Sequence, residues 1–187
     1  DRTHVIVGRW SYELPIGKGR RWLREGAMAK AFGGWDIAGF MTIQTGRPMT
    51  VYSGSNTVSN VVQTPANCNN CKRDFGTVFD DGATGYKWYF NTNERAAFST
   101  PAAGTMGNTG RNYFRGPGSF NTDLSVLKRT YVTESHYVEF RAEFLNLTNT
   151  PTFGFPTLTI TSSTFGRIRD TVSSYSRKMQ LGLKYYF

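Results

Sequence analysis

Two cysteines are the residues with the clearest potential for chemistry. Cys68 and Cys71, in the order C-N-N-C, are the only cysteines among the 187 residues. A structural zinc site usually needs four ligands, but the chain offers no second pair and two distant histidines, His4 and His136. A thioredoxin-like site needs a strand before the pair and a helix after it, whereas TPANCNNCKRD is typical of loop on both sides. The spacing therefore predicts a small disulfide that holds a surface loop in an oxidising compartment.

No catalytic constellation accompanies the cysteines. Both histidines fall at the ends of predicted strands, and the sequence has no G-x-S-x-G motif, so Ser-His-Asp chemistry has no support. The stretch LPIGKGR lacks the spacing of a phosphate-binding loop, and FDDG at 79–82 is more typical of a turn than of a calcium site. We therefore expect no enzyme, and no catalytic, cofactor-binding or metal site.

The composition narrows the class of protein. The net charge is +9, but the basic residues are scattered in short pairs, so an anionic surface such as lipopolysaccharide fits better than nucleic acid. Aromatic residues make up 15% of the chain, and no run of 18 apolar residues exists, which excludes a transmembrane helix. These 187 residues contain no secretory signal, so we expect Asp1 to be either a processed or an internal start.

Strands must position whatever chemistry the chain performs. The last segment, RKMQLGLKYYF, alternates strictly between apolar and polar residues, the period of a strand, and is long enough to cross a bilayer. Its apolar face carries Met179, Leu181, Leu183, Tyr185 and Phe187. Similar alternation predicts further strands near residues 4–14, 35–52, 120–130 and 135–147. A long loop at 54–119 separates the strand at 35–52 from the strand at 120–130.

The strand at 135–147 indicates which environment each face of the sheet contacts. One face carries Val138, Phe140 and Phe144, and the other carries Glu139, Arg141 and Glu143. Three successive charges would be costly in a core but are ordinary on a polar lumen or a solvated face. We expect the apolar row to point outward to lipid and the charged row inward, with a soluble sheet as the alternative.

The connections alternate in length along the chain. A tight turn follows residue 130, whereas the connections at 54–119 and 148–176 are long and polar, which is the pattern of outer-membrane barrels. With the C-terminus on the periplasmic side, the long loops and the cysteine pair fall outside. The exception is residues 15–34, where RRWLREGAMAKAFGG predicts a short helix ended by Gly33 and Gly34. The fold class predicted is all-β, a single domain over 1–187 forming an antiparallel up-and-down β-barrel or barrel-like sheet with long loops on one side and short turns on the other.

Several stretches carry a family resemblance. DRTHVIVGRWSYELPIGKGRRW, GGWDIAGFMTIQTGRPMTV, FRAEFLNLTNTPTFGFP and the terminal LGLKYYF occur in order over nearly the whole chain. The sequence resembles the C-terminal barrel of TonB-dependent outer-membrane receptors, above all the Oar-like group with a carboxypeptidase-regulatory-like domain. The terminal Phe187, with apolar residues at every second place before it, is similar to the signal read by the barrel-insertion machinery. The plug and the TonB-contacting segment of such receptors have no counterpart here, so no site is carried over.

Geometry limits what five strands can do. They fall short of the roughly eight that close the smallest transmembrane barrel, and lipid does not tolerate unpaired edges. We expect a non-enzymatic structural subunit that associates with copies of itself through its edge strands, giving a tube, filament or shared barrel. The alternatives are a C-terminal fragment of a TonB-dependent nutrient transporter, a small barrel closed by extra middle strands, and a soluble β-sandwich binding module. Its expected place is the outer membrane or cell surface of a Gram-negative bacterium, with outer-membrane lipid or lipopolysaccharide as a further partner and no nucleic acid.

Overall fold

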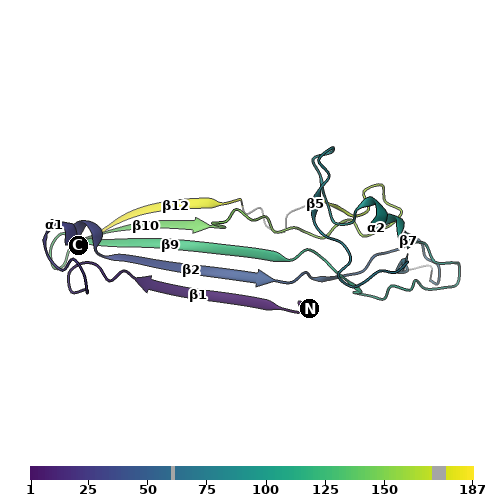
Figure 1. Ribbon diagram of the computed structural model, residues 1–187, viewed down its shortest axis with the longest axis horizontal. Coiled ribbons are helices and arrows are strands. Elements are labelled where there is room, and N and C mark those ends of the chain that lie inside the picture. Colours follow the sequence, from purple (N-terminus) through teal and green to yellow (C-terminus); the bar gives the residue numbers. More distant parts are fainter. Residues whose placement is uncertain (60–61, 170–175) are drawn as a thin grey trace. The chain divides into compact units, whose positions relative to one another are not determined.

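The chain folds into two compact units, seen in a computed structural model that describes residues 1–59, 62–169 and 176–187 (Figure 1). Unit 1 comprises Asp1–Val5, Gln44–Ser119 and Thr152–Ser174. Unit 2 comprises Ile6–Ile43, Phe120–Pro151 and Tyr175–Phe187.

Unit 2 is built on a five-stranded antiparallel sheet. Its strands are β1 (Val5–Glu13), β2 (Trp35–Gln44), β9 (Ser119–Tyr131), β10 (Tyr137–Leu145) and β12 (Lys178–Tyr186), and they lie side by side in that order (Figure 1). Spatial order follows sequence order, so the sheet is an up-and-down meander. The expected all-β antiparallel fold is confirmed. Among the described residues the sheet does not close, because β1 and β12 each pair on one side only.

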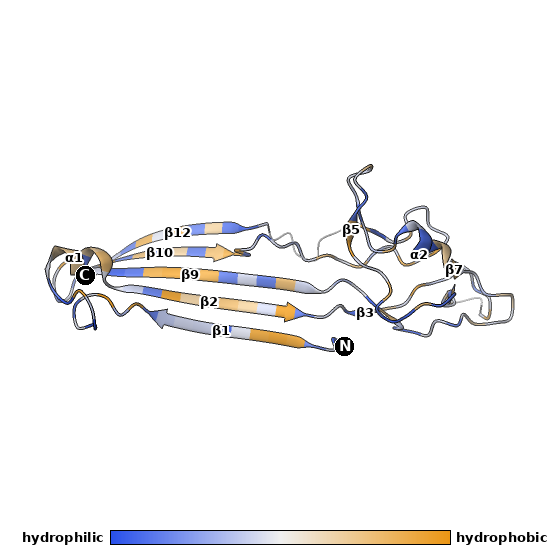
Figure 2. Ribbon diagram, in the orientation of Figure 1, coloured by the Kyte–Doolittle hydropathy of each residue, from blue (hydrophilic) through white to orange (hydrophobic). Residues whose placement is uncertain are grey.

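Along most of β10 and β12 the register keeps apolar residues on one face of the sheet and polar residues on the other. Polar and apolar residues alternate along β12 (Figure 2). Opposite one another on β10 and β12 lie the pairs Phe140 with Leu183, Ala142 with Leu181, and Phe144 with Met179. The intervening pairs are Glu139 with Lys184, Arg141 with Gly182, and Glu143 with Gln180. A slip of one residue would exchange the two faces, so the alternation of each strand fixes the pairing.

Two connections and the C-terminus share one end of this sheet. The connection from β1 to β2 contains the expected short helix, α1 (Gly26–Phe32), which ends where the N–H of Gly33 donates to the carbonyl of Ala29. The connection from β9 to β10 is the expected tight turn, closed by a hydrogen bond from Val132 N to His136 O of 2.9 Å.

The expected strand at 35–52 is divided in the structure. β2 ends at Gln44, and β3 (Pro48–Met49) pairs instead with β8 (Phe114–Arg115). Pro48 has no N–H to continue a ladder. The backbone of Gly46 also approaches that of Gly116 so closely that a Cβ at position 46 would lie 1.7 Å from the Gly116 oxygen. The chain therefore leaves the sheet at this point.

Unit 1 contains short strands around an aromatic core, although residues 54–119 were expected to form a long loop. The remaining elements are β4 (Asn67–Cys68), β5 (Phe79–Asp80), β6 (Lys87–Trp88), α2 (Thr92–Ala96), β7 (Phe98–Ser99) and β11 (Arg167–Ile168). Phe90 and Phe114 are fully buried, and the ring of Phe98 lies 5.4 and 5.5 Å from theirs. A capping box between Asn91 and Glu94 begins α2.

Candidate functional site

A row of ion pairs crosses the polar face of unit 2. Arg129 on β9 lies between Asp36 on β2, at 3.8 Å, and Glu139 on β10, at 3.2 Å. Arg141 in turn contacts Glu139 at 3.2 Å and Glu143 at 3.7 Å. We call these five side chains the charged row. It links three strands, so it couples their register as well as their charge.

Glu139 is the centre of the charged row. Its side chain is 5% exposed, whereas those of Arg129 and Arg141 are 45% and 44% exposed. The register places Arg129 directly opposite Glu139, and Arg141 follows two places along β10 on the same face. Each carboxylate oxygen therefore accepts a charge-assisted hydrogen bond from a different guanidinium. The sequence placed Glu139, Arg141 and Glu143 on one face, but the strand pairing was needed to add Asp36 and Arg129.

A concave region of about 590 Å³ adjoins the charged row. Its polar lining comes from Arg9 and Ser11 on β1, Asp123 and Ser125 on β9, and Glu143 on β10. Apolar residues, among them Phe40 and Leu145, line the rest of the region, so its surface is mixed. Over the described residues no group of three or more histidine, cysteine or acidic side chains has a metal-binding arrangement.

The opposite face of unit 2 is apolar and exposed. Along β12, Met179 is 68%, Leu181 69% and Leu183 72% exposed. A soluble β-sandwich would pack this row against the row Val138 to Phe144 in a core. The structure has the two rows side by side on one face of adjacent strands, so they do not face each other across a core as that alternative expected.

Aromatic side chains gather at the α1 end of this apolar face. Tyr12 is 57%, Tyr185 56% and Phe187 92% exposed, and Trp35 begins β2 beside the end of β1. The Lys128 ammonium lies 5.0 Å from the centre of the Trp35 ring. Transmembrane barrels carry such aromatic girdles where the apolar band meets the headgroups.

The predicted disulfide between Cys68 and Cys71 is present in unit 1. Its surroundings differ from the expected surface loop, because Cys68 is 5% exposed and belongs to the aromatic core. The hydroxyl of Tyr113 donates to the carbonyl of Cys71 at 3.0 Å. The irregular spacing of the core aromatics gave no periodic signal that could have revealed this burial from the sequence.

The two histidines and the FDDG stretch have structural partners of their own. His4 pairs its backbone with Thr45, and the Nδ1 atom of His136 lies 3.0 Å from the hydroxyl of Tyr185. Asp80 forms an ion pair with Lys87, and that hydrogen bond holds the pKa of the Asp80 carboxyl below its usual value. These residues belong to turns and strand ends.

Within the described residues, neither helix is long and apolar enough to span a membrane. The chain matches the family described as outer membrane beta barrel domain over residues 1–180. No curated protein and no solved structure matches it. The match covers nearly the whole chain, so the protein belongs to the outer membrane beta barrel domain family and has its place in the outer membrane of a Gram-negative bacterium.

Proposed function

We propose that the chain forms part of the wall of a non-enzymatic outer-membrane transport barrel related to TonB-dependent receptors. The observation that carries the proposal is the division of one sheet into an exposed apolar face and a face with a charged row. The apolar face would meet lipid, and the charged row would line the lumen. The sequence resemblance to the receptor barrels supports the relation.

The edges of the sheet determine how such a wall is completed. Backbone groups at the outer sides of β1 and β12 have no strand partner among the described residues, and hydrocarbon cannot satisfy them. Successive strands are antiparallel, so β1, β9 and β12 run in the same direction. Joining β12 directly to β1, within one chain or between copies of equal membrane orientation, would create a parallel seam. Bacterial barrels are antiparallel with an even strand number, so closure calls for an odd number of further strands.

Self-association is the second candidate, and the same free edges favour it. Two copies related by a two-fold axis can pair β12 with β12, or β1 with β1, in antiparallel fashion. If both contacts form alternately, the assembly propagates as a filament or tube. This arrangement reverses every second copy, which a membrane would not accept, so it applies to a structural polymer at the cell surface.

Electron microscopy with an intact-mass determination separates the two candidates. The transport wall predicts particles that need detergent and contain strands beyond this 21.0 kDa chain. Filaments or tubes formed without detergent by the chain alone would contradict the transport wall and support the polymer. A monodisperse monomer without detergent would contradict both.

A further inference from the structure

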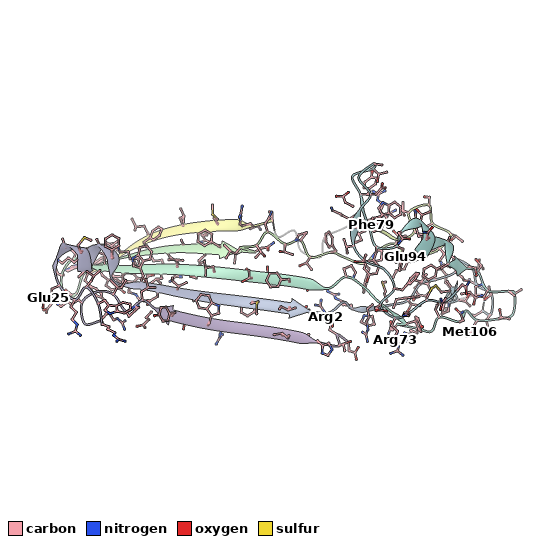
Figure 3. All side chains as sticks on the ribbon, viewed as in Figure 1. Arg2, Glu25, Arg73, Phe79, Glu94 and Met106 are labelled. Atoms are coloured by element: carbon pink, nitrogen blue, oxygen red, sulfur yellow. A yellow bond between two sulfur atoms is a disulfide. The ribbon has the colours of Figure 1, made fainter. Side chains whose placement is uncertain are left out.

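The connection between β1 and β2, residues 15–34, combines exposed apolar side chains with a surplus of positive charge. Trp22 is 57%, Leu23 47%, Met28 57% and Phe32 52% exposed. Figure 3 marks this connection by Glu25, which is the one acidic residue between positions 18 and 30. The same stretch contains the basic residues Lys18, Arg20, Arg21, Arg24 and Lys30. A cluster of this kind in a folded protein marks an interaction surface.

The exposure of these side chains is fixed by the backbone. Trp22 N donates to Pro15 O at 3.0 Å, and Gly17 N donates to Trp22 O at 3.0 Å. Gly17 and Gly33 then bring two segments together, since a Cβ at Gly33 would lie 2.7 Å from the Gly17 Cα. The two segments therefore meet through backbone at this point, and the four apolar side chains named above remain exposed.

Most of these cations have no ion-pair partner among the residues that the structure describes. Arg20 pairs with Glu13. Arg21 lies over the Trp22 ring, 5.8 Å from the ring centre. Within the described ranges, no ion pair is formed by Arg21, Arg24 or Lys30. The free charges stand among the exposed apolar side chains, which fits a surface that is both anionic and apolar.

The position of the connection identifies that surface. It joins the strand ends beside the aromatic girdle of Tyr12 and Trp35, at the end that also holds the tight β9–β10 turn and Phe187. Short turns and the C-terminus are periplasmic in barrels of this kind, and the leaflet on that side consists of phospholipid. We propose that residues 15–34 form an interfacial anchor that binds the anionic headgroups of phospholipids. The inference rests on the sheet spanning the membrane, and it is independent of what the barrel transports.

The test uses the chain within the completed barrel, reconstituted in phosphatidylcholine vesicles that contain brominated phosphatidylcholine or brominated phosphatidylglycerol. The fluorescence of Trp22 is obtained by subtracting the emission of the Trp22→Phe variant from the emission of the unchanged protein. We expect the anionic brominated lipid to quench Trp22 more strongly than the neutral one. In Arg24→Gln/Lys30→Gln the ratio of quenching by the anionic lipid to quenching by the neutral lipid should fall toward one, because each of these cations contributes roughly five-fold in affinity for an anionic surface.

The matched control is Lys72→Gln/Arg111→Gln, which removes the same charge from exposed positions in unit 1. It should leave the preference unchanged, and an equal loss in the control would overturn the proposal in favour of a general charge effect. Quenching of Trp22 by acrylamide alone, while lipid still quenches part of the emission of Trp22→Phe through Trp10 and Trp35 of the sheet, would also overturn the anchor and leave the membrane sheet intact. If lipid quenches no tryptophan, the membrane-spanning sheet and the anchor both fail.

Discussion

The indole ring of Trp10 lies directly on the backbone of Gly39. The hydrogen bond from Leu14 N to Trp35 O sets the pairing of β1 and β2 so that position 10 stands opposite position 39. A Cβ built at Gly39 would lie 2.4 Å from Cε2 of Trp10. Glycine is therefore required here by the space that the ring occupies.

Gly39→Ala should displace Trp10 or separate the two strands. We expect it to lower the free energy of unfolding by about 1 to 3 kcal/mol, the usual cost of overpacking. Denaturant unfolding in detergent, followed by tryptophan fluorescence, measures the change. The control is Gly182→Ala on β12, where nothing lies within 4 Å of an added Cβ and the variant should be neutral or slightly stabilising. Equal losses in both variants would contradict the steric account.

Glu139→Gln should disrupt the charged row more than any other single neutralisation. The change leaves Arg129 and Arg141 without the carboxylate that they share, at a site where the Glu139 side chain is 5% exposed. We expect a loss of about 2 to 3 kcal/mol in the free energy of unfolding, less than for fully buried pairs because both arginines are half exposed. Glu143→Gln, with one ion pair at 3.7 Å, should cost less than about 1 kcal/mol. A larger effect of Glu143→Gln would show that the row is centred elsewhere.

The strands of unit 2 could be predicted because the two faces of each strand contact different environments. Their residues therefore alternate between apolar and polar along the sequence. Strict alternation in 135–147 and 177–187 placed Phe140 and Leu183 on apolar faces and Glu139 on a polar face. The pairing of β10 with β12 places Phe140 directly opposite Leu183. The charged row could be predicted only in part, because the contact of Asp36 with Arg129 depends on pairing between distant segments. The core of unit 1 was missed, since short strands carry no periodic signal and Phe90 and Phe114 meet through tertiary packing.

Reduction of the Cys68–Cys71 disulfide should destabilise unit 1 by about 2 kcal/mol, the chain-entropy value for so short a loop. The effect should be local, because Cys68 packs in the aromatic core of that unit. Hydrogen exchange with and without reductant would show faster exchange around Phe98 and unchanged exchange in β10. A Cys68→Ala/Cys71→Ala variant should no longer respond to reductant. Equal acceleration in β10 would contradict the local effect.

Tyr89 should make the stability of unit 1 fall at alkaline pH. Its ring is 6% exposed and its hydroxyl donates to the carbonyl of Arg115 at 2.8 Å. Burial, with smaller contributions from the charges of Glu94 and Asp74, raises the pKa of Tyr89 from 10.0 to about 12. Below pH 10 both the folded and the unfolded chain hold the phenolic proton, so the stabilisation is complete.

Between pH 10 and 12 the unfolded chain loses this proton while the folded chain keeps it, so the free energy of unfolding should decrease by up to roughly 3 kcal/mol. Tyr89→Phe should remove this part of the pH dependence, at a cost of about 1 kcal/mol near neutral pH for the lost hydrogen bond. Hydrogen exchange in unit 1 as a function of pH, compared at equal intrinsic exchange rate, measures both. The exposed Tyr86→Phe should keep the alkaline loss. An alkaline loss that persists in Tyr89→Phe would assign the effect to another group, because the buried phenol is then not the one that titrates.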